Sequence, residues 1–119
     1  MAQSFNPGDY LVFQLESGYG LLRVLAVDEG DEGARVWHLL AYEELFPDVE
    51  SAESALAAPE SLHARVRHMA LTERAFERTP AAFLGNRPVT DEELTAYREW
   101  QKSVGVVSDR SALLMLGLR

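Results

Sequence analysis

Three histidines and a pair of adjacent glutamates are the side chains that could do acid–base or metal chemistry in this chain. His63 and His68 lie five residues apart, a spacing that suits neither one face of a helix nor one face of a strand. His38 lies between two apolar residues of a strand-like segment, which favours a hydrogen-bonded, partly buried imidazole over a catalytic base. Glu92 and Glu93 belong to the first turn of an expected helix, and that position explains them without catalysis.

The common motifs for catalysis and ligand binding are absent from the sequence. The segment GYG at residues 18–20 could open a dinucleotide-binding fingerprint, but Arg23 stands where the third glycine belongs and a strand follows. The loop DEGDEG lacks the bidentate glutamate of an EF-hand, and no serine lies in a nucleophile elbow. We therefore predict a protein that is not an enzyme, with no catalytic residue, no metal site and no cofactor. The alternative is a small enzyme with a site assembled from scattered polar residues such as His38, Glu44 and Arg65.

Charge is distributed unevenly along the chain. The formal net charge is −8, and residues 28–60 hold ten carboxylates and a single arginine. That segment therefore carries −9, and the rest of the chain carries +1. Because an acidic surface repels a phosphate backbone and attracts a basic protein, we expect a basic protein partner and no nucleic acid. The alternative is an acidic surface that only maintains solubility.

Length and composition predict one globular domain over residues 1–119. The chain is 47% hydrophobic, enough for a core without covalent cross-links. The absence of cysteine excludes disulfides and thiolate metal sites, and it suits a reducing compartment. We find no secretory signal and no apolar stretch long enough to span a bilayer. A cytoplasmic location without membrane contact is therefore expected.

Four segments rich in β-forming residues predict strands. In the second of them both faces are apolar, which is typical of a strand that packs on both sides. Arg23 interrupts one of these faces and is expected near a rim, where its charged end reaches water. Gly20 is expected to mark a bulge or a close approach of another strand. The predicted strands are residues 10–15, 19–27, 34–42 and 64–71.

The clearest prediction of a helix is for residues 91–103, with capping residues directly before it and helical spacing of apolar residues within it. Thr90 and Glu93 form a capping box, and Val89 and Leu94 form a hydrophobic staple around it. Helical spacing of apolar residues continues along the segment. We therefore predict a helix that begins directly after Thr90.

Weaker signals predict three more helical segments. Thr72 is the expected N-cap of a short helix that ends before Pro80, and Ser51 is the expected cap of one or two turns between two prolines. Residues 108–119 form either a last helix capped by Ser108, which we favour, or a closing strand. The whole pattern predicts an α+β protein with an N-terminal antiparallel, SH3-like curved sheet or partial barrel, followed by C-terminal helices.

The chain opens with Gly8-Asp9 before an apolar run, and Tyr19-Gly20 with Arg23-Val24 begins a second run. This opening resembles the immunity protein 26 family of bacterial polymorphic-toxin systems. Sequences of that family commonly open with Gly-Asp, a strand, and a second strand similar to Tyr-Gly-x-x-Arg-Val. Small SH3-like barrels, including Tudor-like and CarD-type modules, also begin in a related way. The resemblance covers roughly the first forty residues and implies an inhibitor that binds a cognate toxin, with no catalytic residues to transfer. The matching residues are Gly8, Asp9, Tyr19, Gly20, Arg23 and Val24.

These observations predict a non-enzymatic protein-binding protein, such as an immunity protein that blocks a bacterial toxin through an acidic face. Steric blocking combined with electrostatic steering is the expected mechanism. An SH3-like adaptor or regulatory module is the alternative. Tyrosine and tryptophan are enriched in interface hot spots, although Trp37 also suits the core. The expected partner-binding residues are Tyr19, Trp37, Tyr42, Glu43, Glu44, Asp48 and Glu50.

Overall fold

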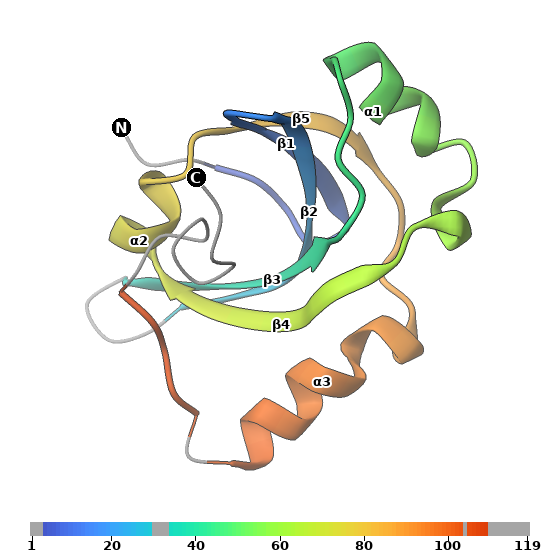
Figure 1. The fold of residues 1–119 in the computed structure, drawn as a ribbon. Helices are drawn as coiled ribbons and strands as arrows, with labels where there is room; N and C mark the ends of the chain where they lie inside the picture. Colours follow the sequence, from blue (N-terminus) through green and yellow to red (C-terminus); the bar gives the residue numbers. More distant parts are fainter. Residues whose placement is uncertain (1–3, 30–33, 104, 110–119) are drawn as a thin grey trace.

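The structure, a computed structural model, describes residues 4–29, 34–103 and 105–109. Within these ranges an antiparallel sheet of five strands combines with three α-helices and a short 3-10 helix, so the protein is α+β as predicted (Figure 1). No helix in this part of the chain is long and apolar enough to cross a membrane. The strands are β1 (Asp9–Leu15), β2 (Gly18–Glu29), β3 (Arg35–Tyr42), β4 (Ala64–Thr72) and β5 (Ala81–Asn86). The helices are α1 (Val49–Ala55), the 3-10 helix η2 (Pro59–Ser61), α2 (Glu73–Glu77) and α3 (Asp91–Lys102).

The strands follow the order β4-β3-β2-β1-β5, so β4 and β5 form the two edges and the sheet is not closed. The four predicted strands are confirmed as β1 to β4. β5 was not predicted, because its sequence AAFLGN has neither a clear alternation nor β-branched residues. It becomes a strand by pairing with the free edge of β1, where Val12 lies opposite Ala82.

The concave face of the curved sheet holds the inner core. Alternate residues of β1 to β4 point to the concave side of the sheet, and α2 covers one end of this inner core (Figure 1). Phe76 of α2 places its ring 4.7 Å from the ring of Trp37, which is fully buried. The strand residues of this core are Leu11, Phe13, Leu15, Leu22, Val24, Trp37, Leu39, Ala41, Met69 and Leu71.

The convex face of the sheet is also covered by apolar residues, and this confirms the prediction that β2 packs on both sides. Leu21 and Leu25 of β2 belong to this outer core, together with Ala52 of α1. Val89 and Leu94, the two residues of the predicted hydrophobic staple, pack against the same cluster. The start of α3 is therefore attached to the convex face, below β4 in Figure 1.

Helix caps follow the predictions in two of three described cases. The capping box of α3 is present, and the hydroxyl of Thr72 accepts the backbone N–H of Ala75 to begin α2. The cap predicted for α1 is wrong: Asp48 is the N-cap, and its carboxylate accepts the N–H of Ser51 at 2.7 Å. The reason is register, since the helix begins at Val49 and the cap must directly precede it.

Of the predicted C-terminal segment, residues 108–119, the structure describes only the first two residues. Ser108 forms a parallel bridge with Leu71 at the edge of β4. Backbone hydrogen bonds join Thr72 to Ser108 and Ser108 to Ala70, at 3.0 and 2.8 Å. The remainder of the predicted segment, residues 110–119, lies outside the described residues.

Replacing Thr90 with alanine is expected to lower the free energy of unfolding by about 1 kcal/mol, because the N–H of Glu93 loses its acceptor. Thr95→Ala is the matched control. Its hydroxyl donates to the carbonyl oxygen of Asp91 within the helix and caps nothing, so little change is expected. Urea denaturation followed by circular dichroism measures both. Equal midpoints for the two variants would show that the cap contributes nothing.

Candidate functional site beside helix α3

Two groups of polar side chains lie against α3 on the convex side of the sheet. The first lines an open hollow of about 880 Å³ between η2, the start of β4 and the side of α3 that runs from Glu92 to Glu99. The second lies under the C-terminal half of α3, where His38 of β3 contacts His68 of β4. We call these two imidazoles the histidine pair. We call the hollow the acidic hollow, and its defining residues are Tyr42, Glu43, Glu60, Arg67, Glu92 and Glu99.

Arg23 forms the floor of the acidic hollow. Its side chain is only 2% exposed, and its Nε and Nη2 donate to the carboxylate of Glu93. Its other acceptors are backbone carbonyl oxygens, of Gly8 at 2.7 Å, Arg87 at 3.1 Å and Pro88 at 3.0 Å. The expected rim position of Arg23 is therefore wrong. A charged side chain can be buried here because its donors meet this set of acceptors.

The carboxylate of Glu93 joins this floor to the start of α3. It accepts from Arg23 and also from the backbone N–H of Thr90, at 2.9 Å. Burial raises the pKa of Glu93, but these hydrogen bonds outweigh burial and hold the pKa below its ordinary value. Glu93 is therefore ionised at neutral pH and ties β2 to the N-terminus of α3.

Two tyrosines complete the floor. The guanidinium carbon of Arg23 lies 4.2 Å from the ring centroid of Tyr10, a cation–π contact. The ring of Tyr42 stacks on Tyr10 with centroids 6.4 Å apart, and Tyr42 is 9% exposed. Burial raises the pKa of Tyr42, so its phenol stays protonated. The floor is thus fixed by contacts on all sides, and its charges, on Arg23 and Glu93, neutralise each other.

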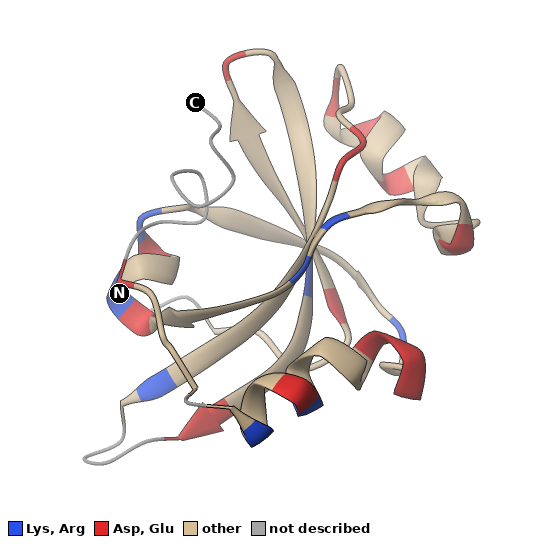
Figure 2. Ribbon diagram, turned by 60° about the horizontal axis from the view of Figure 1, so that its bottom comes forward, with Lys and Arg blue, Asp and Glu red and all other residues tan. Residues whose placement is uncertain are grey.

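Exposed glutamates from three segments surround this floor. One follows β3, one belongs to η2, and two lie seven residues apart on one side of α3. Figure 2 shows the acidic first turn of α3 at one end of that helix, and the residue of η2 lines the same hollow. No ion pair among the described residues includes any of the four, and two arginines, Arg67 and Arg87, line the same hollow. The four glutamates are Glu43, Glu60, Glu92 and Glu99.

A chain of hydrogen bonds runs through the histidine pair to α3. His38 is fully buried; its Nε2 lies 2.8 Å from Oδ2 of Asp28, and its Nδ1 lies 2.9 Å from Nε2 of His68. Because the Asp28 carboxylate only accepts, His38 carries its proton on Nε2 and accepts at Nδ1 from His68. Tyr97 of α3 donates its hydroxyl to the same carboxylate at 2.9 Å. The ring of Trp100 packs against both imidazoles, with centroids 4.7 and 5.6 Å away.

Burial keeps the histidine pair uncharged. It lowers the pKa of His38 despite the attraction of Asp28. Burial, and then repulsion by the charged form of His38, lower the pKa of His68 to about 4. Burial and the Asp28 carboxylate raise the pKa of Tyr97 to about 12. At neutral pH both imidazoles and the phenol are therefore neutral, and Asp28 is the anion that faces them.

An aspartate–histidine–histidine chain has the geometry of a proton relay that could serve a general base. However, neither imidazole lines the acidic hollow, nor a second hollow of about 300 Å³ between β1, α1 and the start of β5. A substrate held in either hollow of the described residues would not contact the relay. In this structure the hydrogen bonds of Asp28, His38 and His68, with the ring contacts of the two imidazoles, hold the C-terminal half of α3 on the sheet.

Three side chains at the junction of β3 and β4 could hold a metal ion. Glu43, Glu44 and His63 each offer one ligand atom, and these atoms lie within 4.8 Å of one another. The two carboxylate oxygens of Glu44 already accept from the backbone N–H and the Nδ1 of His63, both at 2.7 Å. The backbone N–H of Glu43 donates to the carbonyl oxygen of His63 at 2.8 Å. These bonds join the two strand ends, and that structural role accounts for the cluster.

Three of the seven predicted partner-binding residues lie at or beside the acidic hollow. Tyr42 and Glu43 line it, and Glu44 is adjacent through its bonds to His63. Glu44 is therefore not a free charge. Any substitution of Glu44 would change the junction of β3 and β4 as well as the surface.

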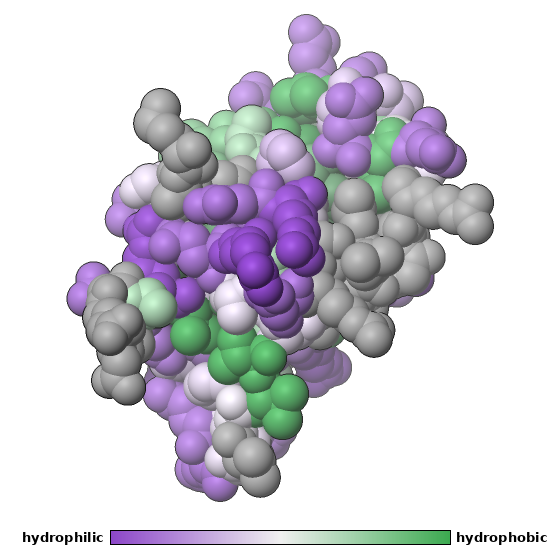
Figure 3. Space-filling view, turned by 90° about the vertical axis from the view of Figure 1, so that its left-hand side faces the viewer, coloured by the Kyte–Doolittle hydropathy of each residue, from purple (hydrophilic) through white to green (hydrophobic). Residues whose placement is uncertain are grey.

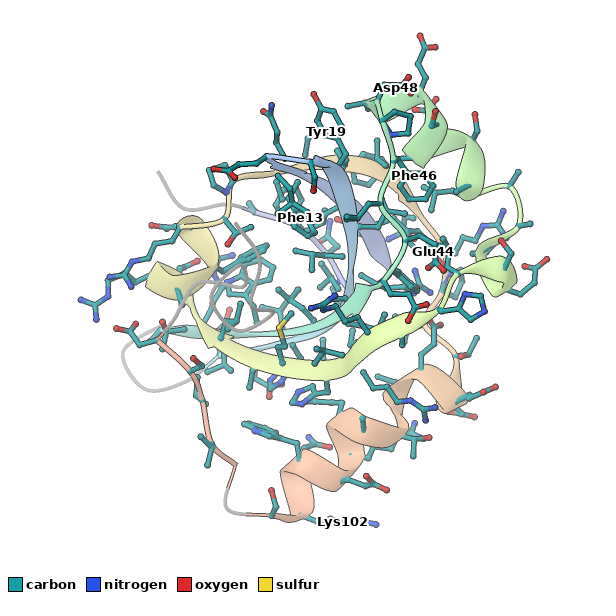
Figure 4. All side chains as sticks on the ribbon, viewed as in Figure 1. Phe13, Tyr19, Glu44, Phe46, Asp48 and Lys102 are labelled. Carbon is teal, nitrogen blue, oxygen red and sulfur yellow. The ribbon has the colours of Figure 1, made fainter. Side chains whose placement is uncertain are left out.

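The other four predicted residues lie elsewhere. Trp37 is fully buried and offers no surface to a partner in this structure. Tyr19 exchanges two backbone hydrogen bonds with Phe46, and Asp48 is occupied as the cap of α1, with Glu50 exposed in the first turn. Figure 4 shows Tyr19, Phe46 and Asp48 beside α1, with Glu44 lower on the connecting segment. The seven residues therefore do not form one face.

Sequence reasoning missed the residues that only tertiary pairing brings together. A usable signal existed for the histidine pair, because His38 and His68 lie in two of the predicted strands, and β3 and β4 are neighbours in the sheet. Arg23, a charged residue inside an apolar strand, was also a signal of a buried partner. Nothing local connects Glu60 of η2 with Glu92 of α3, which converge on the hollow from distant parts of the chain.

Comparisons of this chain with protein-family models, with curated proteins and with solved structures find no match. The resemblance of the N-terminal segment to the immunity protein 26 family therefore stays a prediction.

Proposed function

We propose that this chain is a non-enzymatic binding protein that recognises a basic surface of another protein at the acidic hollow. The observation that carries the proposal is the convergence of four exposed glutamates on one open hollow of about 880 Å³. None of them is committed to an ion pair among the described residues. A guanidinium or ammonium group entering between η2 and α3 would meet carboxylates from both sides.

The floor of the hollow supports this proposal because it is held in place before any partner arrives. Arg23 and Glu93 satisfy each other, and Tyr10 and Tyr42 stack beneath them. A site that is already ordered loses less conformational entropy on binding than a flexible one does.

The distribution of apolar surface favours recognition by charge. Among the described residues, the large hydrophobic side chains that are exposed are few and come from separate segments: Leu45, Val49, Phe83 and Val106. Figure 3 shows the side of the molecule that carries α2, where hydrophilic residues gather in the middle of the view and an apolar patch lies below them. Electrostatic attraction would then raise the rate of association, as in other complexes formed by oppositely charged surfaces.

The finer version of the proposal is an immunity protein of SH3-like architecture that blocks a bacterial toxin in the cytoplasm. An SH3-like adaptor is the alternative, and it would use the same hollow. What supports the toxin version is the N-terminal resemblance, carried by residues such as Arg23. That residue stabilises the floor of the hollow and does not itself face a partner.

An arginine-rich peptide can stand in for the basic partner in a test of the proposal. Hexa-arginine with blocked termini is expected to bind, and to bind less tightly as sodium chloride rises from 20 to 150 mM, because salt screens the attraction. Replacing all four glutamates of the hollow by glutamine is expected to weaken binding about fourfold or more, at roughly 0.2–1 kcal/mol per lost pair. Isothermal titration calorimetry measures both effects.

A second quadruple variant has the same net charge and is the control. It replaces exposed glutamates away from the hollow, Glu16, Glu29, Glu50 and Glu53, by glutamine. Binding to the hollow predicts that this control changes affinity much less than the hollow variant does. If the two variants lose affinity equally, the affinity for the peptide depends only on net charge, and the acidic hollow is not a recognition site. Glu44 and Asp48 are left intact because both have structural roles.

A further inference from the structure

Helix α3 is shared between the acidic hollow and the histidine pair. Glu92 and Glu99 lie on the side of the helix that lines the hollow. Tyr97 and Trp100 lie on the side that contacts the imidazoles of His38 and His68. A movement of the helix would therefore change both places together.

The two ends of α3 are held by different contacts. The first turn is fixed by its capping box and by the ion pair of Glu93 with buried Arg23. The C-terminal half is held by the bond of Tyr97 to Asp28 and by Trp100 packed on the histidine pair. No residue of α3 is fully buried, which is typical of an element that can open locally while the rest stays folded.

Each proton added to the histidine pair puts a charge on an imidazole that the sheet and α3 cover. A first proton leaves the hydrogen bond between the two rings intact, but it makes the pair a cation packed against the ring of Trp100. A second proton would make both facing nitrogens, 2.9 Å apart, N–H donors and would break that bond. The groups that face the pair from the neighbouring elements are Asp28 of β2 and the neutral phenol of Tyr97, so one anion is present for two imidazoles.

We propose that the histidine pair is a proton-sensitive latch: protonation releases the C-terminal half of α3 from the sheet and thereby moves Glu99 away from the acidic hollow. The latch itself depends only on the contacts of α3, whereas its effect on binding rests on the proposed function. Acid would then weaken the recognition of a basic partner.

The direction of the pH dependence follows from the two states of the imidazoles. In the released form a solvated histidine has its ordinary pKa near 6.5, whereas in the docked form the pKa of His68 is about 4. Above pH 6.5 neither form binds a proton and docking does not change. Between pH 6.5 and about 4 His68 binds a proton in the released form but not in the docked form. The ratio of released to docked α3 therefore increases up to tenfold for each unit by which the pH falls.

Hydrogen–deuterium exchange of the unliganded protein tests the latch. Protection factors of the amides of residues 96–102, corrected for the intrinsic pH dependence of exchange, are expected to fall at least tenfold from pH 6.5 to 4.5. The first turn of α3 is expected to change less. His68→Gln keeps an N–H donor for His38 but does not titrate, and it is expected to flatten this fall. His63→Gln, away from the pair, is expected to behave like the parent protein.

Equal loss of protection in the His68→Gln variant and in the parent would overturn the latch, as would protection that does not change with pH. If the variant does not fold, ring NMR shifts of His38 and His68 in the parent decide, because their midpoint must coincide with the loss of α3 protection.

Hexa-arginine binding at pH 5 then tests the coupling. It should be weaker for the parent than for His68→Gln, and equal affinities would overturn the link to the hollow. A peptide that binds neither protein contradicts the proposed function, while the exchange data still decide the latch.

Discussion

Replacing Arg23 with methionine is expected to lower the free energy of unfolding by about 3–5 kcal/mol, the loss typical of removing one partner from a buried ion pair. Methionine fills similar space but donates no hydrogen bond. The partly buried carboxylate of Glu93 would lose its cation, and the carbonyl oxygens of Gly8, Arg87 and Pro88 would lose a donor. Chemical denaturation followed by circular dichroism measures the loss.

Two other substitutions define what Arg23 contributes. Arg23→Lys keeps the charge but cannot meet acceptors in so many directions, so an intermediate loss is expected. Arg98→Met removes an exposed arginine of α3, 50% exposed and paired with Asp91, and should cost less than about 1 kcal/mol. A loss for Arg23→Met no larger than that for Arg98→Met would mean that the floor of the acidic hollow does not stabilise the fold.

Replacing Gly20 with alanine is expected to lower the free energy of unfolding by about 1–3 kcal/mol through overpacking. A Cβ atom at this position would lie 2.6 Å from Cζ of Phe13, the residue opposite Gly20 in the pairing of β1 with β2. The ring of Phe13 is buried in the inner core and cannot move away freely. The sequence predicts a bulge or a close approach of another strand at Gly20; the structure shows that the close neighbour is the side-chain ring of Phe13, in a β1–β2 pairing without a register shift.

Gly85→Ala is the matched control for Gly20→Ala. A Cβ at Gly85 would meet only Cδ1 of Leu56, at an ordinary 3.7 Å, so stability should hardly change. Shortening the opposing side chain in the double variant Gly20→Ala, Phe13→Leu should recover part of the loss, which appears as non-additivity. If the Gly20 and Gly85 variants are equally stable, the ring of Phe13 does not restrict this position.

Much of the fold could be predicted because its signals are local. The alternation of residues in β1 to β4 and the turn residues between β1 and β2 act within a few positions of the chain. The capping box at Thr90 is equally local, and it places the first residue of α3 correctly. Each of these features depends on neighbours in sequence, so no partner from elsewhere is needed to identify them.

Less of the candidate site could be predicted, because its parts come from distant segments. Tyr42 and Glu43 are among the predicted binding residues and do line the hollow, but Glu60, Glu92 and Glu99 are not among them. The acidity of residues 28–60 suggests a single face, although Asp28 lies under α3 beside the histidine pair. Charge counted along a sequence does not say on which side of a sheet each carboxylate lies.

The sequence by itself determined four strands of the sheet and the start of α3, because periodicity and capping operate over a few residues. Only the tertiary structure decided that AAFLGN is a strand, since the free edge of β1 supplies its hydrogen bonds. It also decided that Arg23 is buried, because carbonyl oxygens and a carboxylate from four other positions meet its guanidinium. The histidine pair and the acidic hollow exist for the same physical reason: long-range packing brings together groups that are far apart in the chain.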